Sequence, residues 1–408
     1  MPAEKTPIRN NPALLQRLMS DLYKAPHTFR PTNYWQFYER DIVEYLEKNG
    51  LEHFRSYGTH RLASFGAGTY RTAPFSQSYT QALRYNGFFK STLLAVLYRC
   101  YTTILQWLGA LHPACRLFNT KSFIENERIY LSDYTDLKNA QYRYSELLDK
   151  TAGLHLLHRL EDSGIGSPHD LFTIHGNAYT LPFLLYFDRM AYVASQIDLF
   201  QINTILEIGS GYGGSTEVYL KAFPHIRYFN FDIPPQIYVA QQYLEAVFPG
   251  RVYGYEQYCQ NVPMDQDKYR IFCLPAWTLE SIGDFHFDLL INTASFQEME
   301  PDIVKNYYEL IKNNIDYAYL FELTYGTYKK TSPNGGGAVN PLTLDDYFSV
   351  FSDFDTVSCD NFSRIHHPYT HLLLKNKQLK TIAKQQEPIH FVSNRINRLS
   401  DSTPKRFY

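Results

Sequence analysis

The sequence predicts an α/β fold built on a parallel sheet, and three observations support this prediction. The apolar run Ile205–Ile208, interrupted only by Glu207, is typical of a buried strand and leads into a glycine-rich turn. A helix-like segment, Ser215–Phe223, follows this turn, and a second strand-like segment, Arg227–Ile233, follows the helix. Such a strand, turn and helix open a nucleotide-binding βαβ unit, because glycines allow a tight turn and a close approach to a ligand.

Two cofactors compete for the glycine-rich turn. Gly209, Gly211 and Gly214 satisfy the G-x-G-x-x-G pattern of dinucleotide sites, which is a weak signal by itself. Glu207 favours S-adenosylmethionine, because that cofactor carries an ammonium and a sulfonium whereas a pyrophosphate is anionic. Asp232, at the end of the next strand, can bind the ribose hydroxyls of either cofactor. We therefore predict an S-adenosylmethionine site that comprises Glu207, Gly209, Ser210, Gly211, Gly213, Asp232, Ile233 and Asn292.

Composition limits the class of protein. A chain of 408 residues predicts one large domain or two medium ones, and a net charge of −2 provides no basic field for nucleic acid. The five cysteines are scattered without C-x-x-C spacing, which fits a reducing cytoplasm and argues against a zinc site. No signal peptide is visible, so we expect a cytoplasmic protein. The 35 tyrosines and 28 phenylalanines suit sugar-binding clefts, although a compositional bias of the source proteome explains them equally well.

The first part of the chain reads as mostly helical. Apolar residues recur every three or four positions in Leu14–Tyr23, Tyr34–Lys48 and Ser145–Leu160. Phe88–Leu111 is the most apolar stretch and predicts a core helix, with a peripheral membrane face or a dimer helix as alternatives. Charged and polar residues within it make a membrane span the weaker reading. We expect residues 1–146 to form a helical cap domain that walls the acceptor side of the site.

The remaining chain alternates between strands and helices. Ser163–Tyr179, with His169 and His175, is irregular and suggests a lid over the site, and the helix Leu181–Leu199 follows it. Residues 147–379 are expected to form the cofactor-binding domain, and the polar residues 380–408 a partly ordered tail. The later strands are expected at Arg251–Tyr255, Tyr269–Leu274, Phe287–Asn292, Tyr317–Leu323, Phe354–Asp360 and His371–Asn376, and the later helices at Pro235–Phe248, Asp302–Asn314 and Leu344–Phe351.

Several stretches resemble a known family. Glu207–Gly213 resembles the acid-x-Gly-x-Gly-x-Gly motif of class I methyltransferases. The segments Gly164–Gly176, Phe229–Pro235 and Ile291–Met299 add a resemblance to sugar O-methyltransferases of surface-polysaccharide and natural-product pathways. The resemblance covers about Leu147–Asn376 and implies a Rossmann-like, seven-stranded methyltransferase sheet. It also implies methyl transfer to the hydroxyl of a sugar, nucleotide sugar or glycan.

Methylation of a sugar hydroxyl requires a general base, because the hydroxyl is a poor acid. We expect this base on a loop at the carboxyl ends of the strands, where ligands bind in open α/β sheets. Glu298 is the leading candidate, His366 and His367 come next, and Glu322 and Tyr325 are third. Asp345 and Asp346, with the histidine pair, could contribute to a magnesium site, but no spacing marks one, so we predict no metal.

Two other functions remain open. One is an NAD-dependent oxidoreductase acting on a nucleotide sugar, for which Tyr325 and Lys329 have a suitable Tyr-x-x-x-Lys spacing. Glu207 argues against it. The other is a non-catalytic subunit that keeps a degenerate methyltransferase fold, although the complete glycine motif argues against this. The sequence does not predict the oligomeric state.

Overall fold

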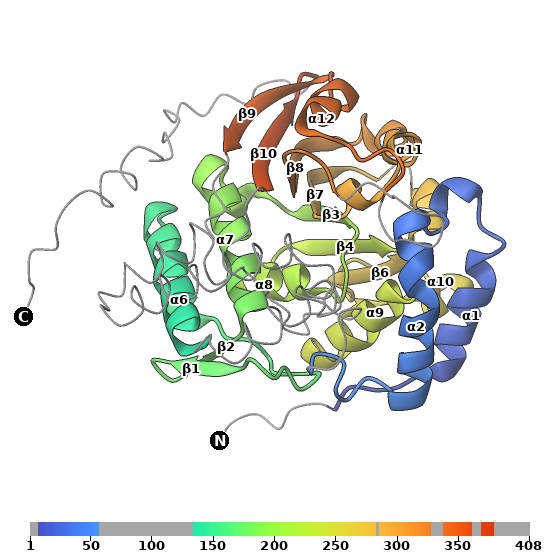
Figure 1. The fold of residues 1–408 in the computed structure, drawn as a ribbon, viewed down its shortest axis with the longest axis horizontal. Coiled ribbons are helices and arrows are strands. Elements are labelled where there is room, and N and C mark those ends of the chain that lie inside the picture. The colour runs from blue at the N-terminus through green and yellow to red at the C-terminus, as the bar shows by residue number, and fades with distance from the viewer. Residues whose placement is uncertain (1–6, 57–133, 283–284, 328–337, 361–368, 379–408) are drawn as a thin grey trace, which may run out of the picture.

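The computed structural model describes residues 7–56, 134–282, 285–327, 338–360 and 369–378. At its centre is an eight-stranded sheet in the order β5-β6-β4-β3-β7-β8-β10-β9 (Figure 1). In this order, each strand from β5 across to β8 runs parallel to the next. β10 is antiparallel to both β8 and β9. The strands are β3 (Thr204–Ile208), β4 (Arg227–Asp232), β5 (Val252–Tyr253), β6 (Ile271–Pro275), β7 (Phe287–Thr293), β8 (Ile315–Leu323), β9 (Phe354–Asp360) and β10 (Tyr369–Asn376).

The observed sheet confirms the predicted α/β class and corrects the predicted strand number. The chain builds outward from β3 to β4 and β6, then returns to place β7 and β8 on the other side of β3. This reversal between β3 and β7 is the topological switch point at which open α/β sheets bind ligands. The family resemblance implies seven strands. The eighth is the two-residue β5, which falls inside the strand expected at Arg251–Tyr255 and extends the edge beside β6.

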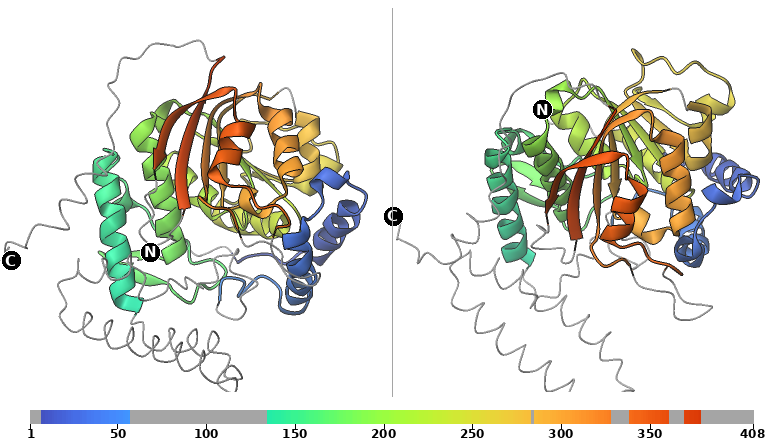
Figure 2. Two further views of the ribbon diagram at one scale, coloured as in Figure 1. Left: turned by 45° about the horizontal axis from the view of Figure 1, so that its top comes forward. Right: turned by 90° about the horizontal axis from the view of Figure 1, so that it is seen from above.

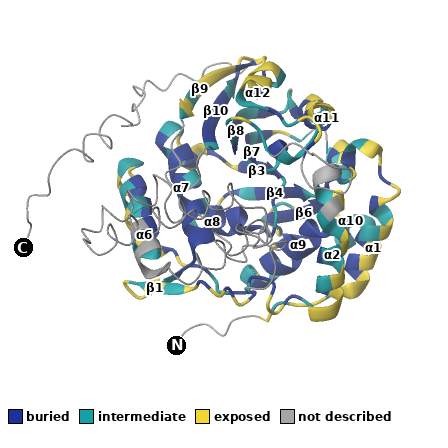
Figure 3. Cartoon of the chain, viewed as in Figure 1, coloured by how far each residue is buried: buried dark blue, intermediate teal, exposed yellow. Residues whose placement is uncertain are grey.

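Helices cover both faces of the sheet because its central strands are apolar on both sides. Within β3, Ile205 packs into one hydrophobic cluster with α7, α8 and α9, while Leu206 packs into a second cluster with α11 and α12. In Figure 3 the central strands and helices α7, α8 and α9 are mostly buried, whereas the edge strand β9 and helices α1 and α2 carry more exposed residues. The bounds of these helices are α7 Leu181–Gln196, α8 Gly214–Ala222, α9 Gln236–Val247, α10 Tyr255–Cys259, α11 Pro301–Ile311 and α12 Leu344–Val350.

The described N-terminal helices lie at two separate places on the sheet domain. Helices α1 (Pro12–Leu22) and α2 (Asn33–Asn49) lie beside α9 and α10, whereas α6 (Tyr134–Thr151) packs against α7 on the other side (Figures 1 and 2). The expected domain boundary after residue 146 falls inside α6. The expected helix Phe88–Leu111 lies outside the described residues, as does the expected tail 380–408. Among the residues that the structure describes, no helix is long and apolar enough to cross a bilayer.

The segment expected to form a lid is instead anchored to the protein. It contains a hairpin of β1 (Phe172–Ile174) and β2 (Asn177–Tyr179). Asp162, just before it, is fully buried and forms a salt bridge with Arg55, and the backbone N–H of Arg55 donates to the carbonyl oxygen of Gly166. His169 and His175 are exposed. The segment is anchored because Arg55 neutralises the buried Asp162 carboxylate, which lies just before Gly164 and Gly166. The sequence did not indicate this pair, since its members are 107 positions apart.

Short helical turns complete the described chain, and some expected helices end earlier than predicted. The helix expected to reach Leu160 ends at Thr151, before Gly153, whose φ is +69°. The helix expected to reach Leu199 ends at Gln196. The short 3₁₀ turns are η1 (His27–Phe29), η4 (Leu157–Arg159), η5 (Leu199–Gln201), η6 (Ala276–Ile282) and η7 (Phe296–Glu298).

Candidate functional site

The glycine-rich turn has backbone angles that require glycine. Gly209, Gly211 and Gly213 have φ values of +79°, +56° and +87°, which L-residues with side chains rarely adopt. A Cβ atom at Gly209 would also lie 2.0 Å from the Oγ atom of Ser295. Gly213 is the N-cap of α8. The turn therefore brings its backbone close to the loop that follows β7 and points the start of α8 toward the switch point.

Asp232 ties the end of β4 to the glycine-rich turn. Its Oδ2 accepts from the N–H of Gly211 at 2.7 Å, and its Oδ1 accepts from the N–H of Ile233 at 2.7 Å. Burial raises the pKa of Asp232 to about 7, although these two amide bonds oppose the shift. An ionised carboxylate accepts about four hydrogen bonds. Asp232 therefore retains acceptor capacity at the mouth of the switch point.

Glu207 lies beneath the turn, on the face of the sheet that packs against α8. Its side chain is buried, and its Oε2 accepts from the hydroxyl of Tyr228 at 2.9 Å. The Tyr228 hydroxyl also lies 3.1 Å from the Oγ of Ser215. Burial raises the pKa of Glu207 to about 8; the hydrogen bond from Tyr228 opposes this, and the charge of Asp232 adds to it. Glu207 is therefore mostly protonated at neutral pH in this structure.

This raised pKa predicts how Glu207 affects stability. Between about pH 4.5 and 8 the unfolded chain releases the Glu207 proton while the folded chain keeps it, so the free energy of unfolding should fall as the pH rises. Replacing Glu207 by glutamine, which resembles the protonated acid, should make this decline shallower. Urea unfolding of both proteins at pH 5 and pH 8 measures the difference. Equal slopes would mean that Glu207 is ionised in the folded protein.

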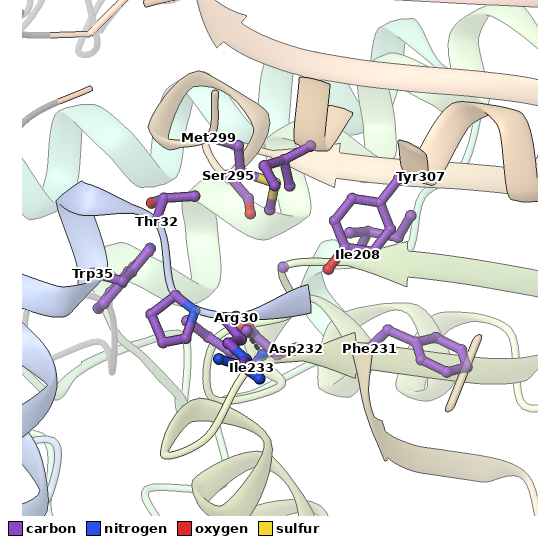
Figure 4. Close-up of a pocket in the computed structure, with 13 residues that line it drawn as sticks. Arg30, Thr32, Trp35, Ile208, Phe231, Asp232, Ile233, Ser295, Met299 and Tyr307 are labelled. Carbon is purple, nitrogen blue, oxygen red and sulfur yellow. Dashed lines mark hydrogen bonds between the residues drawn. The ribbon is translucent and has the colours of Figure 1, made fainter. Parts of the chain in front are cut away.

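A pocket lies at the switch point, and three parts of the chain line it (Figure 4). Two of these parts are the carboxyl ends of β3 and β4 and the region that follows β7. The third runs from the residue after η1 into the first turn of α2, about 170 residues before β3. The lining residues are Arg30, Pro31, Thr32, Trp35, Ile208, Gly209, Phe231, Asp232, Ile233, Ser295, Met299, Ile303 and Tyr307.

The predicted cofactor residues separate into two groups. Gly209, Asp232 and Ile233 line the pocket. Glu207, Ser210, Gly211, Gly213 and Asn292 do not line it. The Oγ of Ser210 is buried and has no hydrogen-bond partner among the described residues. A buried hydroxyl without a partner is costly, and a ligand at the turn would remove that cost.

Asn292 has a positioning role that its sequence context did not reveal. Its Nδ2 donates to the carbonyl oxygen of Ile208 at 2.7 Å, and its Oδ1 accepts from the N–H of Phe296 at 2.8 Å. The side chain is fully buried. Asn292 therefore joins the ends of β3 and β7 and holds the start of η7.

Glu298 is held by the N-terminal segment. The Nε1 of Trp35 donates to the Oε2 of Glu298 at 3.0 Å, and the Oγ1 of Thr32 donates to the Glu298 carbonyl oxygen at 2.8 Å. These contacts span 263 and 266 positions in the sequence. Sequence reasoning missed both partners, since no local pattern connects α2 with the loop after β7. They place the candidate base beside the pocket that Trp35 and Thr32 also line.

Residues 189–268 match the family model of the O-methyltransferase domain. The match runs from the middle of α7 through β3, the glycine-rich turn, β4 and α9, and therefore includes the predicted cofactor motif. It covers less than half of the chain. No curated protein matches this chain.

Solved structures with similar folds were also found. The mitomycin 7-O-methyltransferase MmcR is 15% identical with a TM-score of 0.32, covering 47% of this chain and 56% of that one. Magnesium protoporphyrin IX methyltransferase from Synechocystis, with bound SAH, is 13% identical with a TM-score of 0.34, covering 48% and 83%. Human N-acetylserotonin methyltransferase, in complex with SAM, is 12% identical with a TM-score of 0.29, covering 48% and 56%. Similarities this low say nothing about the substrate of this chain.

The other candidate bases lie in contrasting places. His366 and His367 lie outside the described residues. Glu322, at the end of β8, is buried, its Oε2 accepts from the N–H of Gln297 at 3.1 Å, and burial raises its pKa well above the usual range. It therefore supports η7 as a mostly neutral acid. Tyr325 is 76% exposed.

Of the residues considered for a metal ion, the structure describes only Asp345 and Asp346. Asp346 accepts from the N–H of Thr343 at 2.7 Å and from its hydroxyl at 2.8 Å, which caps α12. A different group, His286, Asp288 and Asp316, could hold a cation by its spacing. It lies near the amino ends of β7 and β8, at the other end of the sheet from the pocket. The prediction that the site uses no metal stays a prediction.

Proposed function

We propose that this chain is an S-adenosylmethionine-dependent O-methyltransferase that methylates a sugar hydroxyl. The observation that carries the proposal is the glycine-rich turn at the switch point, with Asp232 bound to it. Both lie inside the stretch that matches the O-methyltransferase domain. The resemblance of Ile291–Met299 to sugar O-methyltransferases and the aromatic composition support the sugar. Surface-polysaccharide or glycoconjugate biosynthesis is the corresponding pathway class.

The residues at the switch point fit this cofactor. The Asp232 carboxylate keeps acceptor capacity for ribose hydroxyls, and the buried Ser210 hydroxyl needs a partner. The bare glycine backbone allows a ligand to approach, and the apolar side chains Ile208, Ile233 and Ile303 suit a purine. When bound, the cofactor supplies a methyl group on a sulfonium, which is a good leaving group.

The chain itself must orient the acceptor and remove its proton. Glu298 is the proposed base, and the Trp35 indole donates to its Oε2, which orients the carboxylate beside the pocket. Arg30, Pro31, Thr32 and Trp35 line one side of the pocket, where they would limit the access of water. That residues 1–146 form a cap over the acceptor stays a prediction.

Calorimetry with S-adenosylhomocysteine and NAD side by side tests the cofactor. We expect S-adenosylhomocysteine to bind and NAD not to bind. Replacing Asp232 by asparagine removes one charge-assisted hydrogen bond to the ribose, so its affinity should fall by about 10–100-fold. Asp267→Asn, an exposed acid outside the site, is the control and should bind normally. NAD binding without any heat from S-adenosylhomocysteine would instead indicate the oxidoreductase alternative.

A further inference from the structure

Arg189, in the middle of α7, has no salt-bridge partner among the residues that the structure describes. Its Cζ lies 4.5 Å from the ring centroid of Phe321 and 5.2 Å from that of Tyr186. Within the described part of the chain it forms no salt bridge and no hydrogen bond, and its side chain is partly exposed. Two aromatic faces thus hold a guanidinium in place while its N–H groups remain available.

This guanidinium lies at the end of the sheet where the pocket opens. Phe321 is in register with Thr293, the last residue of β7. Its ring stacks on Tyr369 at 4.8 Å with an interplanar angle of 7°. The Tyr369 hydroxyl accepts from the Nε2 of Gln297 at 3.2 Å, and Gln297 directly precedes Glu298. A continuous row of side chains therefore connects Arg189 with the loop that carries the candidate base.

The two acids near Arg189 that affect its surroundings, Asp188 and Glu207, are buried and each accepts a hydrogen bond from another side chain. Asp188 accepts from the Nε2 of Gln141 at 2.5 Å, and burial raises its pKa to about 7. Glu207 accepts from Tyr228 and has a pKa of about 8. Burial raises the pKa of Tyr369 to about 12, and the charge of Arg189 is among the effects that oppose this rise. Within the described residues, the positive charge of Arg189 is therefore not neutralised by a salt bridge, and it acts on Tyr369 in this row.

We propose that Arg189 binds an anionic group of the acceptor, either a carboxylate of an acidic sugar or a phosphate of a sugar phosphate. A guanidinium recognises both groups through paired N–H donors. The inference rests on the proposed function, because it assigns the acceptor of the same site. The position of Arg189 favours the acceptor over the cofactor. Asp232, the proposed ribose ligand, lies on β4, whereas Arg189 packs against β8. Strands β3 and β7 lie between them.

Binding measurements with three probes test this proposal. Glucose, glucuronate and glucose 1-phosphate are titrated by calorimetry into the full chain saturated with S-adenosylhomocysteine. We expect at least one anionic sugar to bind about 10–100-fold more tightly than glucose. The preference for glucuronate or for glucose 1-phosphate identifies the source of the anion. Arg189→Gln should remove this preference, whereas Arg251→Gln, an exposed arginine at the opposite edge of the sheet, should keep it.

Three results separate the possible failures. The proposal is wrong if the wild-type chain shows no preference for an anionic sugar, or if Arg189→Gln keeps that preference. It is also wrong if Arg189→Gln weakens S-adenosylhomocysteine but not 5′-methylthioadenosine, because Arg189 would then bind the amino-acid carboxylate of the cofactor. Absence of S-adenosylhomocysteine binding in the wild-type chain would instead refute the proposed function itself.

Discussion

Replacing Glu298 by glutamine is expected to lower turnover by about 10²–10⁴-fold, the usual size of a general-base contribution. Glutamine keeps the length of the side chain and an oxygen that can accept from the Trp35 indole, but it cannot take a proton. Affinity for S-adenosylhomocysteine should hardly change, because Glu298 does not line the pocket at the switch point. Turnover and calorimetric affinity, measured on the same preparation, separate the two effects.

The control for this variant is Glu309→Gln, which neutralises an acid on α11 whose side chain is about half exposed. It should turn over like the wild type. Should Glu298→Gln keep its rate while His366→Ala or His367→Ala loses it, the proton leaves through the loop before β10. Loss of cofactor binding in Glu298→Gln would place this residue in the cofactor site, and the base would have to lie elsewhere.

Replacing Asp162 by alanine is expected to lower the free energy of unfolding by about 3–5 kcal/mol, because it leaves the Arg55 charge buried without a counter-ion. The two side chains are 0% and 1% exposed and pair through two bonds, Nη2–Oδ2 at 2.6 Å and Nη1–Oδ1 at 2.9 Å. Burial favours the protonated acid, but the charge and hydrogen bonds of Arg55 hold the pKa of Asp162 below its usual range. This stabilisation is therefore present above about pH 4 and is lost as the pH falls.

Urea unfolding at pH 7 and at pH 3 measures this effect. Glu146→Ala is the matched control, because it removes an exposed pair with Lys150 at 3.3 Å on α6 and should cost at most about 0.5 kcal/mol. The double variant Arg55→Met/Asp162→Leu should be less destabilised than Asp162→Ala, since it leaves no unpaired charge in the core. An unchanged urea midpoint for Asp162→Ala would show that water reaches Arg55.

Much of the sheet domain could be predicted from the sequence because its signals are short-range. The strands β3, β4, β7 and β8 appear where apolar runs predict them, within two residues at each end. The glycines of the turn are recognisable because positive φ angles leave few alternatives to glycine. At the sheet edge the apolar pattern predicted a strand over Arg251–Tyr255, of which only the two residues of β5 form one, whereas the family resemblance implied seven strands in all.

The candidate site could be predicted only in part, because four of its thirteen lining residues come from the distant N-terminal segment. Asp232 and Gly209 were identifiable from their spacing around the first βαβ unit, and both line the pocket. Trp35 and Thr32 were not identifiable, since nothing in a polar helix start indicates a contact with Glu298. The buried roles of Glu207 and Asn292 were also hidden, because the side-chain environment depends on which strand lies next to which.

What the sequence by itself determined about this protein is therefore the βαβ unit: a buried strand, a turn that only glycine can form and an acid at the end of the next strand. These features follow from backbone angles and apolar periodicity, which act over a few residues. Only the tertiary structure decided that Trp35 of α2 lines the pocket, that Arg55 pairs with Asp162, and that Arg189 lies against Phe321. Such contacts depend on the strand order and on the packing of distant helices, where burial and charge pairing act between residues that no local pattern connects.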